Sequence, residues 1–196
     1  MTVSNAYVRF WEAIDRGSRP ADDLRQYESE LVPGLLQTPE YAEAVIRTPG
    51  GTDEDTDVSR RVAMRQDGQR LLTRRDPVPP IYEVAISETV LHRVVGGPAV
   101  MAEQLRRIND LSDRLEHVTV RILPFSAGAH GGAMAGSSVS MRFPDADDPD
   151  SVFVEGLTGA LYLRKPKELE RYETAFADIF ARGLDVDASR ELIKHS

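Results

Sequence analysis

The sequence contains no cysteine, and this absence excludes several classes of protein. Disulfide-stabilised folds, thiolate metal centres and enzymes with a cysteine nucleophile all depend on that residue. No apolar run approaches the roughly 18 residues that a membrane-spanning helix requires. The first twenty residues carry Arg9 and Glu12 around a short apolar patch and no small-residue cleavage pattern, so they do not resemble a secretion signal. These absences favour a soluble cytoplasmic protein.

Positive charge is also scarce, because 24 Lys and Arg residues face 32 Asp and Glu residues and give a formal net charge of −8. Proteins that bind nucleic acid usually present a basic face, so direct nucleic-acid binding by this chain alone is not expected. One segment is locally basic and contains Arg60, Arg61, Arg65, Arg70, Arg74 and Arg75. We interpret it as a solvated helix face paired with the acidic loop before it, with an anion-binding surface as the alternative.

The length of 196 residues, of which 41% are apolar, fits one domain with a single core. We expect residues 1–20 to be an N-terminal extension and residues 21–196 to form the domain. Apolar spacing predicts helices over residues 21–31, 39–47, 58–75, 87–95, 98–117, 166–182 and 188–194. Alternating patterns predict strands over residues 81–87, 118–125, 137–143, 151–157 and 160–165. The expected fold class is α+β, with helices covering one face of a mainly antiparallel sheet whose last three strands form a meander.

The stretch LVPGLLQTPEYA, residues 31–42, predicts a sharp corner between the first two helices. Pro33 and the following glycine end one helix, two leucines anchor the turn in the core, and Thr38 caps the next helix. Gln37 and Tyr41 would then lie beside each other at the rim. The motif is either a helix corner alone, or Gln37 and Tyr41 also form part of a pocket wall.

Motifs for cofactors and metals are missing. The glycine loop GAHGGAMAG lacks both GxGxxG and the ending of a P-loop, and it precedes a strand. The acidic stretch at 53–57 has Val58 and Met64 where a calcium loop needs its glycine and its bidentate acid. The stretch at 145–150 has Pro149 at a ligand position and Asp150 at the glycine position. The four histidines have no metal-site spacing, and no GxSxG elbow is present. We therefore expect no cofactor and no metal.

Three titratable residues conflict with their setting and are the candidate catalytic residues. Glu88 lies between a strand end and an apolar helix start, His130 lies in the glycine loop, and Glu155 interrupts the apolar run SVFVEGL. Each has a structural explanation: a helix-dipole partner, an exposed loop residue and an outward strand residue. If the meander forms as expected, His130 and Glu155 would face the same sheet edge, where an imidazole and a carboxylate can bind a polar ligand or move a proton.

Several stretches occur in the same order in a known family. They are YESELVPGLLQTPEYAEAVIR (27–47), SETVLHRVVGGPAVMAEQL (87–105), VTVRILPFSAGAH (118–130), VFVEGLTGALYLRKPKELERYETAFADI (152–179) and ASRELI (188–193). Over residues 21–195 the chain resembles the actinobacterial DUF5753 domain of Scr1-like, antitoxin-type transcriptional regulators. The resemblance rests on several separate motifs.

The resemblance implies a regulatory role. In typical members the domain follows an N-terminal helix-turn-helix domain of the Xre type, and a small DUF397 protein is the suggested partner. Only about twenty residues precede the first matching segment here, too few for a helix-turn-helix domain, so the family's DNA binding is not carried over. Candidate ligand-binding residues, all within the matching stretches, are Gln37, Tyr41, Arg121, Phe125 and Tyr162.

Two hypotheses follow. The first is a stand-alone regulatory domain that binds a small molecule, a DUF397-type partner or both, with homo-oligomerisation left open. The second is a cofactor-independent lyase, cyclase or isomerase of small-molecule biosynthesis that uses an acid–base pair drawn from Glu88, His130 and Glu155. In the second case His130→Ala should abolish turnover.

Overall fold

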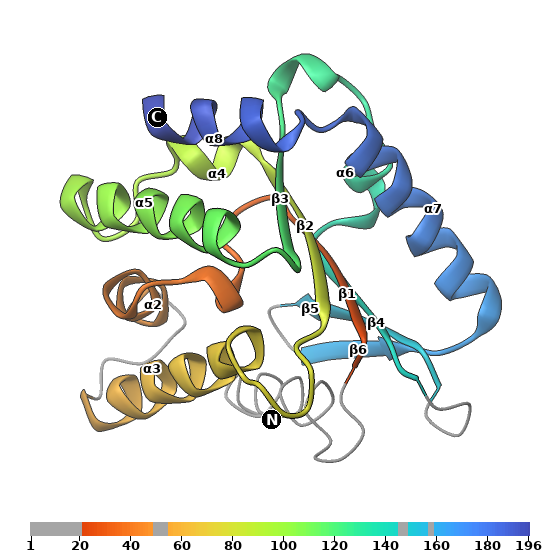
Figure 1. Ribbon diagram of the computed structural model, residues 1–196, viewed down its shortest axis with the longest axis horizontal. Helices are drawn as coiled ribbons and strands as arrows, with labels where there is room; N and C mark the ends of the chain where they lie inside the picture. Colours follow the sequence, from red (N-terminus) through yellow and green to blue (C-terminus); the bar gives the residue numbers. More distant parts are fainter. Residues whose placement is uncertain (1–20, 49–54, 145–148, 157–158) are drawn as a thin grey trace.

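A six-stranded mixed sheet forms the centre of the structure, a computed structural model that describes residues 21–48, 55–144, 149–156 and 159–196 (Figure 1). The strand order is β3-β2-β1-β4-β5-β6. The parallel half contains β1 (Asp23–Glu28), β2 (Ile81–Ser87) and β3 (Val118–Leu123). The antiparallel half contains β4 (Ser138–Arg142), β5 (Ser151–Gly156) and β6 (Gly159–Leu163). The expected α+β class and the C-terminal meander are therefore confirmed.

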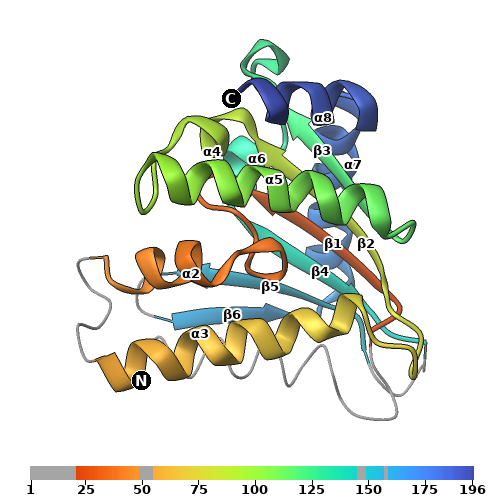
Figure 2. The same cartoon turned by 60° about the vertical axis from the view of Figure 1, so that its left-hand side comes forward.

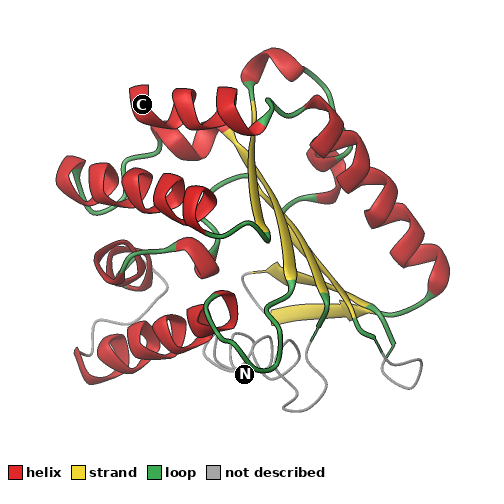
Figure 3. Cartoon of the chain, in the orientation of Figure 1, coloured by secondary structure: helices red, strands yellow, loops and turns green. Residues whose placement is uncertain are grey.

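Helices cover both faces of the sheet (Figure 3). The face with the larger core carries η1 (Gly34–Leu36), α2 (Pro39–Ile46), α3 (Asp55–Gln69), η2 (Arg70–Leu72), α4 (Glu88–His92), α5 (Pro98–Arg114) and α8 (Val186–His195). The opposite face carries α6 (Gly132–Ala135) and α7 (Pro166–Arg182), and the short turn η3 (Phe125–Ala127) follows β3.

The expectation that helices cover only one face is wrong. The central strands bury apolar side chains on both sides, which the alternation of a strand allows. Tyr27, Ala85 and Leu123 pack with Phe176 and Ile179 beneath α7 in a second, smaller core.

The predicted helix over residues 21–31 is also wrong, because Asp23–Glu28 forms the central strand β1. The apolar residues in this stretch satisfy helical spacing, but pairing with β2 on one side and β4 on the other gives the backbone a full set of partners in the sheet. Tertiary pairing thus overrides a weak helical pattern. The corner at Pro33 accordingly follows a strand and not a helix.

Most other elements agree with the sequence-based expectations within a few residues, but α6 lies in the glycine loop, where no helix was expected. Thr38 caps α2 as predicted, because its hydroxyl accepts a hydrogen bond from the Tyr41 backbone N–H at 3.2 Å. The two leucines of the corner, Leu35 and Leu36, are buried in the main core. The helix expected from residue 58 begins at Asp55 and ends at Gln69.

Some predictions lie outside the described residues. They are the N-terminal extension over 1–20, the first two residues of the acidic stretch at 53–57, four residues of the acidic stretch at 145–150, and the two residues between β5 and β6. Among the helices within the described ranges, none is long and apolar enough to cross a membrane.

Candidate functional site

A cavity of about 250 Å³ opens between the larger-core face of the sheet and the η1, α2 and α3 segments. Figure 2 shows α2 and α3 lying in front of the antiparallel half of the sheet. The described residues that line the cavity are Gln26, Glu28, Glu30, Leu31, Val32, Gly34, Leu35, Gln37, Val45, Arg65, Ser137, Ser138, Val139, Phe153 and Glu155. The cavity therefore combines apolar walls with a few charged and amide groups.

Strand register brings two carboxylates into this cavity. Gln26 pairs with Val139, and Val139 pairs with Phe153, so these three residues form one row across β1, β4 and β5. Glu28 and Glu155 each lie two residues further along strands that run in the same direction, so they point to the same face. The two backbones are about 10 Å apart, because two strand spacings separate them.

Glu28 is the last residue of β1, and its carboxyl group is enclosed although the residue as a whole keeps some exposure. The side-chain amide of Gln26 donates to Glu28 Oε1 at 2.7 Å. The hydroxyl of the fully buried Tyr82 donates to Gln26 Oε1 at 2.6 Å, which turns the Gln26 amide nitrogen toward Glu28. The paired strands β1 and β2 thus supply a chain of hydrogen bonds, from Tyr82 to Gln26 to Glu28, that fixes the position of the carboxyl group.

Burial raises the pKa of Glu28 from its ordinary value of 4.5 to about 7. Hydrogen bonds from Gln26 and Ser137 oppose this rise, because they favour the charged form. The negative charge of Glu155 adds to it. At neutral pH, Glu28 therefore exists in both protonation states.

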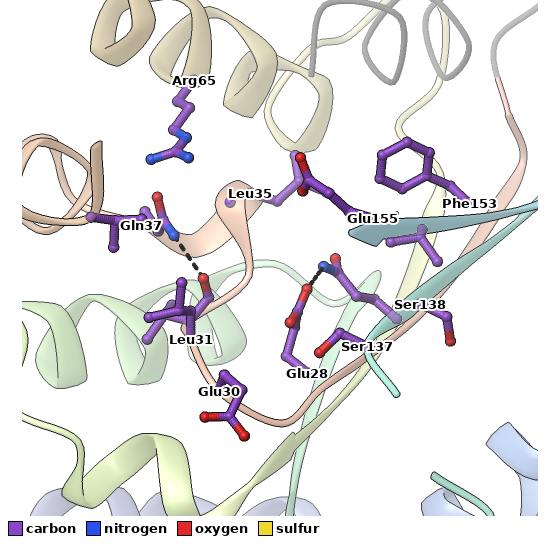
Figure 4. A pocket seen from close by; sticks show the side chains of 15 residues that line it. Glu28, Glu30, Leu31, Leu35, Gln37, Arg65, Ser137, Ser138, Phe153 and Glu155 are labelled. Carbon is purple, nitrogen blue, oxygen red and sulfur yellow. Dashed lines mark hydrogen bonds between the residues drawn. The ribbon is translucent and has the colours of Figure 1, made fainter. Parts of the chain in front are cut away.

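Glu155 lies at the open side of the cavity, where surrounding atoms reduce the hydration of its carboxyl group and raise its pKa. The guanidinium group of Arg65 on α3 opposes this rise. Arg65 also donates to the backbone carbonyl of Ala42 on α2 at 3.2 Å. Figure 4 shows Arg65, Gln37, Glu28 and Glu155 entering the cavity from different elements.

Gln37 lines the cavity, in line with the interpretation that the corner at residues 31–42 also forms part of a pocket wall. Gln37 is only 4% exposed. Its side-chain amide nitrogen donates to the Val32 carbonyl at 2.8 Å, and its backbone carbonyl accepts from the side-chain amide of Gln69 at 2.6 Å. Its Oε1 atom accepts no hydrogen bond from any residue in the described part of the chain. One buried acceptor is thus left available beside the cavity.

Tyr41 does not lie at the rim, contrary to the prediction. Its side chain is 0% exposed, and its hydroxyl accepts a hydrogen bond from the Val32 backbone N–H at 3.1 Å. The aromatic ring fills the core, and the hydroxyl holds the corner after β1. Tyr41 therefore supports the loop that carries Gln37.

The three candidate catalytic residues do not converge. His130 packs edge-on against Tyr27 with ring centroids 5.8 Å apart, on the α7 face of the sheet, whereas Glu155 faces the cavity on the opposite side. Glu88 is the first residue of α4, and its Oε2 accepts a hydrogen bond from the Phe125 backbone N–H at 2.7 Å. The expected approach of His130 to Glu155 is wrong, because side chains on opposite faces of a sheet cannot meet.

The other candidate ligand-binding residues lie in three different places. Arg121 lies under α7, with its guanidinium 4.4 Å from the centroid of the Phe180 ring. Phe125 is 62% exposed, and its ring stacks on His92. Tyr162 on β6 contacts Phe153, with centroids 5.2 Å apart, and therefore stands behind one wall of the cavity.

The cavity residues that the sequence analysis did not name as site residues include Glu28 and Arg65. Glu28 was missed because its segment was assigned to a helix; in strand β1, Leu24, Gln26 and Glu28 share one face of the sheet. Arg65 was treated as one of several arginines on a solvated helix face. Over the described ranges, no three histidine, aspartate or glutamate side chains gather as metal ligands.

Comparison with known proteins identifies the family but no individual relative. Neither a search of curated proteins nor a search of solved structures found a match. A family model described as a domain of unknown function, DUF5753, matches residues 18–195, which is nearly the whole chain. The chain therefore belongs to the DUF5753 family.

Proposed function

We propose that this chain is a regulatory domain that binds a small molecule in the cavity between β1, β4, β5 and the η1, α2 and α3 segments. The observation that carries the proposal is the enclosed Glu28 carboxyl group, fixed by Gln26 and Tyr82 at a cavity wall. Enclosing a carboxyl group costs folding free energy, and cavities that contain perturbed titratable groups are commonly binding sites. An apolar side chain at this position would give a more stable sheet without a ligand.

The dimensions restrict the ligand. A volume of about 250 Å³ lies just below the roughly 300–1,000 Å³ of sites for drug-sized ligands. Leu31, Leu35 and Val45 supply apolar lining, and Glu28, Glu155 and Arg65 supply charged groups. A compact amphipathic molecule with one ring or a short chain fits this description.

The regulatory part of the proposal rests on the family resemblance. Ligand binding would fix η1, α2 and α3 relative to the sheet, and a DUF397-type protein or a second copy of the chain would recognise that state. A complex with a DUF397 protein should then form with an affinity that changes when the ligand is present.

Native mass spectrometry of the purified protein after exposure to a cell metabolite extract tests the proposal. We expect a compound to be retained by the wild type and by Glu103→Gln, a control on the exposed side of α5, and to be lost from Glu28→Gln. Equal retention by all three proteins, or retention by none, would overturn the proposed function.

A cofactor-independent enzyme is the second candidate, favoured by the pKa of Glu28 near 7. A carboxyl group that titrates near neutral pH can both accept and return a proton, as isomerase, lyase and cyclase steps require. The acid–base group would then be Glu28 and not His130. The same extract separates the two candidates, because an enzyme consumes a compound at substoichiometric protein concentration, whereas a binding domain retains it unchanged.

A further inference from the structure

The cavity presents more acceptors of hydrogen bonds than donors. Three carboxylates line it, against the single guanidinium of Arg65 among the described lining residues. Glu30 is the outermost, and it pairs with Arg93 at the exposed rim. Of the other two carboxylates, Glu28 is enclosed and Glu155 lies at the open side of the cavity (Figure 4). When Glu28 and Glu155 are both ionised, they outnumber the single guanidinium of Arg65, so the cavity keeps an excess of negative charge.

A second observation at the site is independent of charge. Gln37 is nearly completely buried, and its amide orientation is fixed because Nε2 donates to the Val32 carbonyl. The remaining Oε1 atom lies at the cavity wall with no hydrogen-bond donor among the described residues. A buried acceptor without a donor is unfavourable, so a ligand N–H group at this position would remove the cost.

We propose that the ligand is a small organic cation, a protonated amine or amidine on a short apolar body, whose N–H groups are directed at Glu28, Glu155 and Gln37. This inference rests on the proposed function and specifies its ligand class. The apolar body contacts the apolar lining of the cavity, which includes Phe153, Leu31 and Leu35. An anion would be repelled by the carboxylates of Glu28 and Glu155, and a neutral alcohol would offer too few donors for the acceptors present.

Four probes of nearly equal size test the charge of the ligand. Benzylamine and benzamidine are cations, benzyl alcohol is neutral and benzoate is an anion. Titration calorimetry at pH 8, where Glu28 is ionised, should give dissociation constants at least tenfold lower for the cations than for the other two. Amide chemical-shift changes in NMR spectra should map to the cavity residues.

Variants of the cavity residues test whether these residues cause the preference for cationic probes. Glu28→Gln keeps the shape of the side chain and should reduce the advantage of benzylamine over benzyl alcohol to less than threefold. Glu155→Gln lies at the open side of the cavity and provides a second test that does not depend on an enclosed position. Gln37→Leu should weaken both cations, and Glu103→Gln should leave all affinities unchanged.

The outcomes separate this inference from the proposed function. Tighter binding of benzyl alcohol or benzoate in the cavity would overturn the cation assignment and leave small-molecule binding standing. An unchanged cation preference in both Glu28→Gln and Glu155→Gln would also overturn the assignment. If none of the four probes binds at millimolar concentration, the cation assignment fails, and the metabolite-extract experiment alone decides the proposed function.

Discussion

Replacing Glu28 by glutamine should make the protein more stable at neutral pH and leave its stability unchanged below pH 4.5. The folded-state pKa of Glu28 is about 7, against an ordinary value of 4.5. The folded protein therefore holds a proton that the unfolded chain releases, and the contribution of this group to stability is complete below pH 4.5. That contribution is lost as the pH rises toward 7. Glutamine keeps the shape and the hydrogen bonding but does not titrate.

The magnitude follows from the two pKa values. Their difference corresponds to about 3 kcal/mol over the whole transition, of which about 2 kcal/mol falls between pH 5 and pH 7. The free energy of unfolding of Glu28→Gln should thus rise by about 2 kcal/mol relative to the wild type over this interval. Other groups that titrate, including Glu155 at the same cavity, are present in both proteins and largely cancel in the difference.

Urea denaturation at half-unit steps between pH 5 and pH 8, followed by circular dichroism, measures this difference. Glu103→Gln serves as the control and should follow the wild type at every pH, because its side chain is on the exposed surface of α5. Parallel curves for Glu28→Gln and the wild type would refute the argument, since they would mean that the Glu28 carboxyl group is hydrated as in the unfolded chain.

Three further predictions concern binding and packing. If the ligand binds only ionised Glu28, its dissociation constant at pH 6 should be about ten times that at pH 8, measured by calorimetry, and a pH-independent constant would contradict this requirement. His130→Ala should leave ligand retention unchanged, because His130 packs against Tyr27 on the opposite face of the sheet; loss of retention would contradict the assigned site. Gly132→Ala should lower the free energy of unfolding by about 1–3 kcal/mol in urea, since the added Cβ would lie 2.6 Å from a Tyr27 ring carbon and 2.8 Å from Ile179 Cδ1; wild-type stability would show that α6 moves freely.

The C-terminal meander and the long helices could be predicted from the sequence because their patterns are local. Alternation in β4, β5 and β6, and apolar spacing in α5 and α7, persist over enough residues to specify one period. The segment of β1 is short, and its apolar residues Leu24 and Tyr27 have helical spacing. Its conformation is decided by β2 and β4, which lie more than 50 and more than 100 residues further along the chain, so local patterns cannot identify it.

The candidate site was predicted only in part for the same reason. Gln37 and Glu155 were found because each breaks a local pattern, an amide in an apolar corner and a carboxylate in an apolar strand. The role of Glu28 depends on the Tyr82 hydroxyl that orients Gln26, and this contact joins two parallel strands. His130 also breaks a local pattern, but the face on which it lies is set by α7.

The topology explains why the cavity forms beside Glu28. β1 is the strand at which the sheet changes from parallel to antiparallel pairing, with β2 on one side and β4 on the other. β2 leads directly into α4 at its carboxyl end, whereas the chain after β1 turns away through the corner to η1 and α2. The end of β1 is therefore left beside the start of β4 and the end of β5, and α3 closes the space from the other side. Ligands of open sheets bind at positions where strand connections diverge in this way. A carboxyl group at the last residue of β1 is thus placed by the fold at the point where a ligand has room to reach it.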